Sequence, residues 1–398
     1  MKTDIAIVGA GIVGLATALQ LSRKKPDLKI CVLDKEQEVA AHQTGHNSGV
    51  IHSGIYYKPG GSKAVNCRKG YRYLLDFCVE NEVPHDICGK VIVATRPEEI
   101  PLLKGIFERG QANGLEGIRM LTAEEVVEKE PHVAALAGIW VPQTGIVDFG
   151  VVARKYAELI QNQGGTLLLG RALTGMERRD GKILVKSTGG EIETKVLVNC
   201  AGLFADKAAR MTGIDPGCLI VPFRGEYYVL SKEKEELVNN LIYPVPNPNF
   251  PFLGVHYTRM MRGGIEAGPN AVLAFRREGY SRWDIRWGEL METFAYPGFR
   301  TVAGKYWKTG MGEIYRSFSK AAFVRALQHL IPEVTGKDLR RGGAGVRAQA
   351  IDPKGNLIDD FLIHESPKVI NVLNAPSPAA TASLAIGETV AEKVIQQL

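Results

Sequence analysis

The chain opens with two short apolar runs on either side of a helical pattern. Residues 5–8 and 29–33 are almost continuously apolar, which is typical of parallel strands buried on both faces. Between them, Leu15 and Leu19 fall on one helical face, and the pattern ends near Lys24. The order strand, helix, strand predicts the first unit of an α/β fold with a parallel sheet.

Similar apolar runs recur along the rest of the chain and predict further strands. They cover residues 90–94, 166–169, 183–187 and 195–200. A helical pattern over residues 381–398 ends the chain. With 398 residues, the chain is longer than one simple core usually requires, so we expect two domains.

A glycine motif joins the first predicted strand to the first predicted helix. Gly9, Gly11 and Gly14 form a GxGxxG pattern, and Asp34 follows Gly14 by 20 residues at the end of the second strand. Such glycines allow a tight turn, a close approach of a pyrophosphate, and packing of the helix on the strand, while the acid binds a ribose hydroxyl. The motif therefore predicts a dinucleotide site, although by itself it does not distinguish FAD from NAD.

Composition excludes several classes of protein. Hydrophobic residues make up 45% and charged residues 23%, as in ordinary globular proteins. A net charge of +6 is too small to indicate nucleic-acid binding. The six cysteines show no metal-binding or disulfide spacing, so we expect free thiols and no metal site. No apolar stretch is long enough to predict a membrane span.

A polar segment helps to distinguish FAD from NAD as the dinucleotide. Residues 41–57 contain three histidines and several small polar side chains and glycines, a composition unlike that of a core element. Its place directly behind the nucleotide unit suggests contact with the ribityl chain or ring of a flavin. A polar surface loop is the alternative.

Several long motifs then resemble one known family. HQTGHNSGVIHSGIYY, PFRGEYY, NFPFLGVH, GPNAVLAFRREGY, AGVRAQA and NAPSPAA are similar to the L-2-hydroxyglutarate dehydrogenase/oxidase family. That family belongs to the FAD-dependent oxidoreductases that resemble D-amino-acid oxidase and glycine oxidase. The resemblance covers essentially the whole chain and implies FAD as the cofactor. One small departure is Asp34, where the family more often has Glu.

The resemblance also implies a fold class and a domain organisation. The fold would be α/β, with a Rossmann-like FAD-binding domain and a discontinuous α+β substrate domain built on a mixed antiparallel sheet. Residues 1–83, 148–212 and 335–398 would form the first domain. Residues 84–147 and 213–334 would form the second.

The implied chemistry is oxidation of L-2-hydroxyglutarate to 2-oxoglutarate, with transfer of a hydride from Cα to flavin N5. Histidine is the usual base for the hydroxyl proton, and His52 and His256 are the two candidates. Arginine clamps carboxylates in bidentate fashion, and Arg347 is the leading candidate. Further candidates for substrate contacts are Tyr57, Tyr243, Arg224 and Arg277, although Glu226 could neutralise Arg224 and a solvated face is the favoured interpretation of Arg277.

The predicted cofactor contacts come from segments far apart in the chain. They are Gly9, Gly11, Gly14, Asp34, Lys35, Thr44, Asn47, Ser48, Gly49, Val50, Ala172, Leu173, Ala201, Gly202, Gly345, Pro376, Ser377, Ala379 and Ala380.

Three other functions remain open: an amino-acid or amine oxidase of the same fold, a flavin-bearing sensor, and an NAD-dependent dehydrogenase. A quinone or oxygen would reoxidise the flavin. Residues 280–330 carry eight basic and four acidic side chains and three of the four tryptophans. Such a segment suits an anionic membrane surface, and a packed helix pair with a charged outer face is the alternative. The expected location is cytoplasmic, with peripheral attachment to the inner face of the cell membrane as an option.

Overall fold

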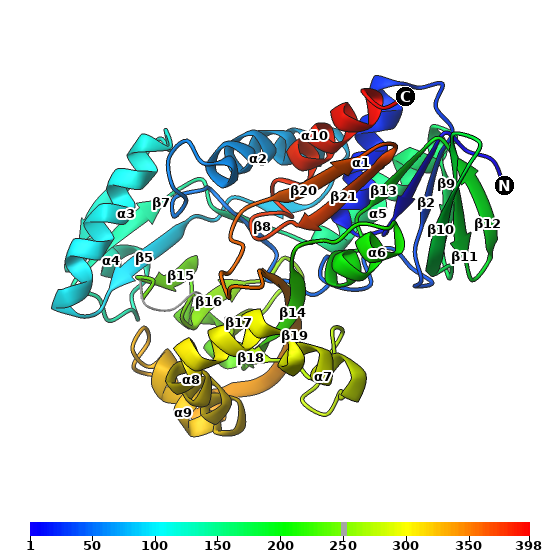
Figure 1. Ribbon diagram of the computed structural model, residues 1–398. Coiled ribbons are helices and arrows are strands. Elements are labelled where there is room, and N and C mark those ends of the chain that lie inside the picture. Colours follow the sequence, from blue (N-terminus) through cyan, green and yellow to red (C-terminus); the bar gives the residue numbers. More distant parts are fainter. Residues whose placement is uncertain (248–252) are drawn as a thin grey trace.

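The computed structural model describes residues 1–247 and 253–398. Two large sheets, lying at an angle to each other, form its framework (Figure 1). Four residues of the NFPFLGVH motif, at positions 249–252, lie outside the described residues.

The first sheet is the predicted parallel one and carries the glycine motif. Its strand order is β20-β21-β13-β1-β2-β9, and all neighbours are parallel except β20 and β21. The strands are β1 (Ile5–Val8), β2 (Ile30–Leu33), β9 (Thr166–Leu168), β13 (Val196–Asn199), β20 (Leu362–Ser366) and β21 (Val369–Asn374). The four apolar runs predicted here as strands all occur: β1, β2 and β13 are fully buried between two layers, and β9 at the edge of the sheet is half-buried.

Helices cover one face of this sheet and a small sheet covers the other. Helix α1 (Ile12–Lys24) packs against α10 (Ser383–Ile395) and α5 (Phe149–Asn162), and α10 packs against α2 (Ser62–Glu80). On the other face, β10 (Leu173–Arg179), β11 (Lys182–Ser187) and β12 (Gly190–Thr194) bury Ile183, Val185 and Ile192. The C-terminal helix is two residues shorter at its start and three at its end than the pattern predicts.

The second sheet is mixed, with one parallel pair. Its order is β18-β14-β17-β16-β15-β5-β7-β6, with β19 on the other side of β14, and only β15 and β5 are parallel. The strands are β5 (Lys90–Ala94), β6 (Arg119–Thr122), β7 (Ala137–Val141), β14 (Leu219–Leu230), β15 (Leu241–Pro244), β16 (His256–Arg259), β17 (Ile265–Gly268), β18 (Val272–Leu273) and β19 (Leu339–Ile351). This mixed α/β architecture agrees with the predicted fold class.

One predicted domain boundary cuts through this second sheet. Residues 335–398 were expected to lie in the FAD-binding domain, yet β19 pairs with β14 along eleven registered positions, from Leu219 and Ile351 to Leu230 and Leu339. The glycine-rich stretch at 342–345 fits into this long strand, and its pattern gave no signal of a strand. The domain division itself stays a prediction.

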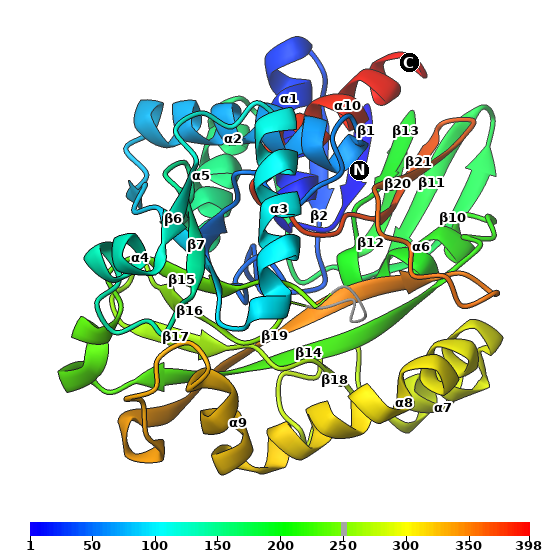
Figure 2. The same cartoon turned by 90° about the vertical axis from the view of Figure 1, so that its left-hand side faces the viewer.

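Two yellow helices cover the outer face of the second sheet, below the long strands β14 and β19 in Figure 2. Phe299 and Val302 of α8 (Pro297–Phe318) pack on Leu219, Val221 and Ile351. Helix α7 (Trp287–Ala295) precedes α8 and α9 (Lys320–Leu327) follows it. Within residues 1–247 and 253–398, none of the helices combines the length and apolar character that a membrane span requires.

The remaining elements connect the two sheets. A small sheet has the order β3-β8-β4 and joins the segments after β2, α2 and β7. Its strands are β3 (Val50–Ile51), β4 (His85–Asp86) and β8 (Gly145–Val147), and the other helices are α3 (Ile100–Ala112), α4 (Ala123–Lys129) and α6 (Ala205–Met211).

Candidate active site

A cavity of about 1030 Å³ lies between the two large sheets. It reaches from the β1–α1 turn and the end of β2 to the inner side of the second sheet, where Tyr243, His256 and Arg347 line it. Segments from the start, middle and end of the chain therefore meet around one space. Such a cavity is the default location of a ligand site.

At one end of the cavity, the glycine motif brings the backbone of α1 close to the space. Gly9 has φ +108°, and a Cβ there would lie 2.3 Å from the carbonyl oxygen of Cys200, so only glycine fits the turn. Gly11, Ile12 and Val13 at the start of α1 line the cavity. The positive end of the helix dipole therefore faces it, as binding of a pyrophosphate requires.

The carboxylate of Asp34 lies at the carboxyl end of β2 and also lines the cavity. Its Oδ2 accepts a hydrogen bond of 2.7 Å from Ala10 N, and its Oδ1 accepts one of 2.9 Å from Glu36 N. The backbone of Arg171 donates to the Asp34 carbonyl at 2.7 Å, which brings residues 171–173 to the same end. This arrangement fits an adenosine ribose between Asp34 and that segment.

The residues present fit a long dinucleotide with a ring at its far end. A Cβ on Gly11 would lie in ordinary contact with Thr44 Oγ1, at 3.4 Å, and both residues line the cavity. At the far end, the Tyr56 hydroxyl is buried with no hydrogen-bond partner among the described residues, although Tyr56 lines the cavity. A buried hydroxyl without a partner is costly, so a ligand that contacts it would relieve that cost.

Both candidate bases lie at the far end. The backbone of His52 is fixed, since its N–H donates to Thr381 Oγ1 at 3.1 Å and its carbonyl accepts from Cys67 Sγ at 3.3 Å. The His256 ring packs against the Tyr243 ring, with centroids 4.0 Å apart and the two planes tilted by 33°. Both rings line the cavity, so the structure brings together two residues that are 204 positions apart in the sequence.

The tautomer of His256 follows from its neighbour. Nδ1 lies 2.9 Å from the Gly254 carbonyl oxygen, which can only accept, so Nδ1 carries the proton. In the neutral ring, Nε2 is then an unprotonated acceptor. Burial lowers the pKa of His256 to about 4, and burial together with the charges of Lys90, His256 and Arg347 lowers the pKa of His52 to about 3. Both imidazoles are therefore neutral near pH 7.

Arg347 presents its charge to the cavity. It lies on β19 opposite Phe223, and although it is deep in the molecule, its side chain is exposed because it borders the open space. Burial lowers the pKa of Arg347, while Tyr227, Tyr57 and Asp359 partly compensate. Tyr57 and Tyr243 also line the cavity, and their contact with a substrate stays a prediction.

The other two predicted arginines are held by acids. Arg224 donates to Glu226 Oε1 from Nε at 3.2 Å and from Nη2 at 3.0 Å, which is the neutralisation considered from the sequence. Arg277 binds Asp206 through two hydrogen bonds of 2.5 and 2.9 Å and does not line the cavity. The solvated face expected for Arg277 is wrong, because its side chain is only 2% exposed.

Most predicted cofactor contacts border the cavity. They are Gly9, Gly11, Asp34, Lys35, Thr44, Asn47, Ser48, Val50, Ala172, Leu173, Ala201, Gly202, Gly345, Ser377, Ala379 and Ala380. Gly14, Gly49 and Pro376 do not. A Cβ on Gly14 would lie 2.0 Å from the Gly9 carbonyl oxygen, so this glycine serves the packing of α1 on β1.

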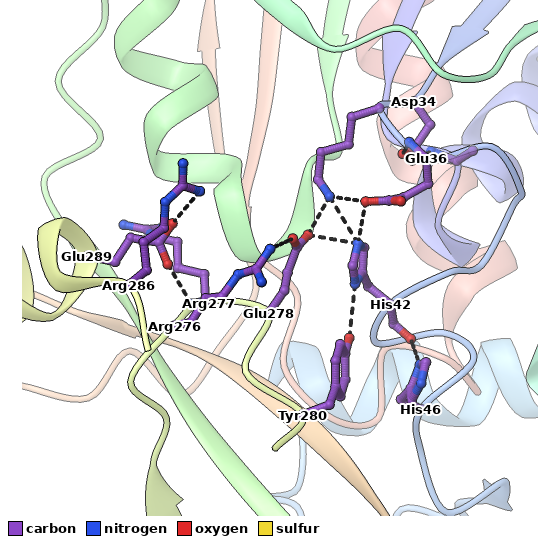
Figure 3. A network of polar contacts seen from close by, with 12 residues as sticks. Asp34, Glu36, His42, His46, Arg276, Arg277, Glu278, Tyr280, Arg286 and Glu289 are labelled. Atoms are coloured by element: carbon purple, nitrogen blue, oxygen red, sulfur yellow. Dashed lines mark hydrogen bonds and ion pairs between the residues drawn. The ribbon is translucent and has the colours of Figure 1, made fainter. Parts of the chain in front are cut away.

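A network of charges joins the nucleotide end to the segment after β18. Figure 3 shows Glu278 and His42 pointing toward each other, with an Nε2–Oε1 distance of 2.8 Å. Lys35 Nζ lies 2.7 Å from Glu278 and also contacts Glu36, and the Tyr280 hydroxyl lies 3.1 Å from His42 Nδ1. Although Glu36, His42 and Glu278 are close enough to share a metal ion, the Lys35 ammonium already forms ion pairs with both acids.

Sequence reasoning missed three residues of the far end. Tyr56 and Tyr227 line the cavity, and each is adjacent in the sequence to a residue that was considered, Tyr57 or Glu226. The third is Lys90, the first residue of β5. A lysine at the start of an otherwise apolar run indicates a buried charge, but this run was interpreted from the sequence only as a strand.

Comparisons with known proteins agree with this geometry. Residues 4–393 match the family described as FAD dependent oxidoreductase. The chain is 56% identical to an L-2-hydroxyglutarate dehydrogenase of Indibacter alkaliphilus over 100% of both chains. It is 44% identical to the enzyme of that name from Escherichia coli, over 98% of this chain and 93% of that one.

The chain belongs to the FAD-dependent oxidoreductases, within the L-2-hydroxyglutarate dehydrogenase family. It is therefore an oxidoreductase with FAD as its cofactor. The fold is similar to that of L-alpha-glycerophosphate oxidase from Mycoplasma pneumoniae, with a TM-score of 0.80 and 23% identity over 100% of this chain and 95% of that one. Glycine oxidase from Geobacillus kaustophilus shares the fold with a TM-score of 0.75 and 16% identity, over 100% and 95% of the two chains.

Proposed function

We propose that this flavoenzyme oxidises L-2-hydroxyglutarate to 2-oxoglutarate. The observation that carries the proposal is the far end of the cavity, where two neutral histidines and the Arg347 charge border one space. Bound FAD would supply the acceptor for the hydride from the substrate's Cα. The names of the full-length relatives support the same substrate.

In this proposal, a histidine removes the proton from the substrate's hydroxyl as the Cα–H bond breaks. His256 is favoured, because the Gly254 carbonyl holds its proton on Nδ1 and leaves the Nε2 lone pair available. His52 is the alternative, since it also lines the cavity and is neutral. The substrate's hydroxyl would donate to Nε2 in the ground state and transfer its proton in the reaction.

Arg347 would bind one carboxylate of the substrate, since its guanidinium can form two parallel hydrogen bonds. Tyr57 and Tyr243 would add hydroxyl donors, because burial raises the pKa of both and keeps them protonated. The unpartnered hydroxyl of Tyr56 offers a further donor. A guanidinium and three hydroxyl donors around one space suit a dianionic substrate better than an amine.

Anaerobic mixing of the FAD-bound protein with L- and D-2-hydroxyglutarate tests the proposal. Loss of the flavin's visible absorbance with the L isomer alone is expected. Bleaching by amino acids or amines instead would indicate an oxidase of those substrates, and no bleaching by any of them would favour a sensor. A preparation without flavin absorbance that reduces NAD would contradict the whole interpretation.

A quinone or oxygen would accept the electrons afterwards. Admitting oxygen, or a soluble quinone, to the reduced enzyme distinguishes the two by their rates. A faster reaction with quinone is expected if the enzyme works at a membrane. A rate with oxygen that matches turnover would assign an oxidase instead.

Helices α7 and α8 support a location on the inner face of the cell membrane. Their exposed surfaces carry large apolar residues at helical spacing, which on α7 are Trp287, Met291 and Phe294, and on α8 are Trp307, Met311, Ile314 and Phe318. Trp287 is 69% exposed and Trp307 is 60% exposed. An ordinary charged outer face would not show two such apolar stripes.

The charges on these helices fit an anionic lipid surface. The bases Arg286, Arg300, Lys305 and Lys308 are exposed. The acids Glu289 and Glu313 are buried, and Glu292 is paired with Lys207 and Arg277. An apolar face with a basic surround binds anionic membranes, with about 1 kcal/mol per basic residue near the surface.

Flotation with vesicles tests this surface. Wild-type enzyme should bind phosphatidylglycerol vesicles, lose binding as salt rises, and bind phosphatidylcholine vesicles weakly. Exchanging Trp287 and Trp307 for Glu should abolish binding, whereas Val79→Glu, at an equally exposed site on α2, should not. Unchanged binding by the double variant would contradict the assignment. The assignment would also fail if the wild-type enzyme binds no vesicles but self-associates, and the double variant does not self-associate.

A further inference from the structure

A lysine lies buried behind the wall of the active site. Lys90 is the first residue of β5, in register with Leu241 of β15 and Val141 of β7, and it is 1% exposed. It therefore sits inside the second sheet and not at its rim. Fully buried lysines are rare unless they are paired.

Aromatic rings separate Lys90 from the cavity. Its Nζ lies 4.7 Å from the centroid of the Tyr56 ring and 4.9 Å from that of Tyr243, and both rings line the cavity. These two faces stabilise an ammonium by cation–π contact. Among the described residues, no carboxylate lies within ion-pair distance of Lys90, so the rings are a weak substitute for a counter-charge.

The groups around Lys90 add positive charge or none. His52 and His256 are neutral near pH 7, and Arg347 carries a positive charge at the same end of the cavity. The other titratable and charged groups that face this end are Tyr56, Tyr57, Cys67, Tyr227, Tyr243 and Glu266, together with Asp359 on the side of Arg347 and Tyr57. Burial raises the pKa of Glu266 to about 7, so this acid does not supply a reliable negative charge.

Surroundings of this kind favour an uncharged lysine. Burial lowers the pKa of Lys90 to about 7, so above pH 7 most of the amine is neutral. A dianion in the cavity would reverse this preference, because opposite charges attract strongly at a few ångströms in a poorly solvated site. The lysine would then hold its proton well above pH 7.

We propose that Lys90 takes up a proton from solvent when the dicarboxylate binds, and that its ammonium, acting through the Tyr56 and Tyr243 rings, compensates the second negative charge. The amine gains one proton and the solvent loses one, with no other bond changed. Lys90 is thus a positioning residue for the ligand's charge. The inference rests on the proposed function only in taking a dicarboxylate as the ligand.

Linkage gives the expected pH dependence. Where binding takes up a proton, affinity falls as pH rises, by up to about tenfold per unit above the pKa of the free group. The histidines would not produce this effect, because their pKa values of about 3 and 4 are too low. Glu266, whose pKa burial raises to about 7, would take up a proton in a similar range, so a fall in affinity between pH 7.5 and 9.5 is assigned to Lys90 only where the Lys90 variants remove it.

The experiment uses the FAD-bound protein and 2-oxoglutarate, which binds without turnover. Flavin absorbance reports binding, and an indicator dye in weakly buffered solution at pH 8 reports protons. Wild-type enzyme should take up a proton, to at most one per site, with affinity that falls as pH rises. Lys90→Met should bind more weakly, take up none and show a flat pH profile.

A conservative variant separates charge from packing. Lys90→Arg keeps a permanent positive charge, so it should take up no proton and hold its affinity at high pH. If the visible spectrum shows that Lys90→Met has lost FAD, Lys90→Arg is used in its place. A monoanion, such as a half-ester of 2-oxoglutarate, should cause less uptake than the dianion.

The possible failures are distinct. Binding of 2-oxoglutarate by wild-type enzyme without proton uptake at pH 8 overturns the inference and leaves the proposed function intact. Undiminished uptake in Lys90→Met or in Lys90→Arg overturns it as well. If no dicarboxylate binds at all, the proposed function fails and this inference fails with it.

Discussion

The far end of the cavity and the outer face of α7 and α8 differ in the kind of side chain that is buried or exposed. In the first region, ionisable groups such as Lys90, His52 and His256 are withdrawn from water. In the second, tryptophan and methionine side chains are exposed to it. Each region departs from the usual partition of polar residues outside and apolar residues inside. Both departures cost free energy in the isolated chain, so each indicates a missing contact, with an anionic ligand in one case and a lipid surface in the other.

The two departures differ in what removal of a side chain would do. In the cavity, a variant should change chemistry and leave the fold largely intact, because the lost group acts on a ligand. On the outer face, a variant should change neither flavin reduction nor stability. Four predictions test this contrast.

The largest effect is expected at the histidines. His256→Ala should slow flavin reduction by L-2-hydroxyglutarate about 10²- to 10⁴-fold, because the hydroxyl proton loses its acceptor. Stopped-flow absorbance measures the rate, and the flavin spectrum checks that FAD is retained. His364→Ala, at an exposed site, is the control.

His52→Ala, measured in the same way, tells which ring is the base. The ring whose loss has the larger effect on the rate, with little effect on FAD binding, is the base. Wild-type rates in both variants would remove histidine from the mechanism.

A smaller effect, on the affinity for the ligand, is expected at Arg347. Arg347→Met should weaken binding of 2-oxoglutarate about 10- to 150-fold, in keeping with about 1.5–3 kcal/mol for hydrogen bonds to a charged group. Flavin absorbance during titration measures the affinity. Arg341→Met, an exposed arginine on the same strand, should bind normally. Equal affinity in both variants would assign Arg347 to structure.

Acid should destabilise the protein through the two buried histidines. Their pKa values in the folded protein lie below the unfolded value of 6.5, so below pH 6.5 the unfolded chain binds more protons. Stability should therefore fall as pH drops from 7 toward 4. Urea unfolding at several pH values measures this, and His256→Gln should make the loss shallower. A variant as acid-sensitive as wild type would contradict the shifted pKa.

The smallest effect is expected on the outer face. Trp287→Ser should change the free energy of unfolding by less than about 0.5 kcal/mol, since the side chain is mostly exposed and has little packing to lose. Its rate of flavin reduction in solution should equal that of wild type. A marked loss of stability would show that the tryptophan packs within the protein, and would remove the contrast between the two regions.

The nucleotide half of the site could be predicted because its parts are neighbours in the sequence. Strand, glycines, helix and Asp34 all lie within 30 residues, and each contributes through its own backbone or side chain. The catalytic half was predicted less completely. His52, His256 and Arg347 were identified as candidates and do meet, whereas Arg277 was not recognised as the partner of Asp206, 71 positions away.

The sequence by itself determined the class of fold, the glycine motif and acid that are typical of a dinucleotide site, and the unusual apolar and basic character of residues 280–330. Local periodicity and motif spacing suffice for these. Only the tertiary structure decided which face of α7 and α8 is exposed, which nitrogen of His256 carries the proton, and that Lys90 is buried without an acid nearby. The reason is physical: burial, tautomer and charge compensation depend on neighbours that distant segments supply, and no single segment encodes them.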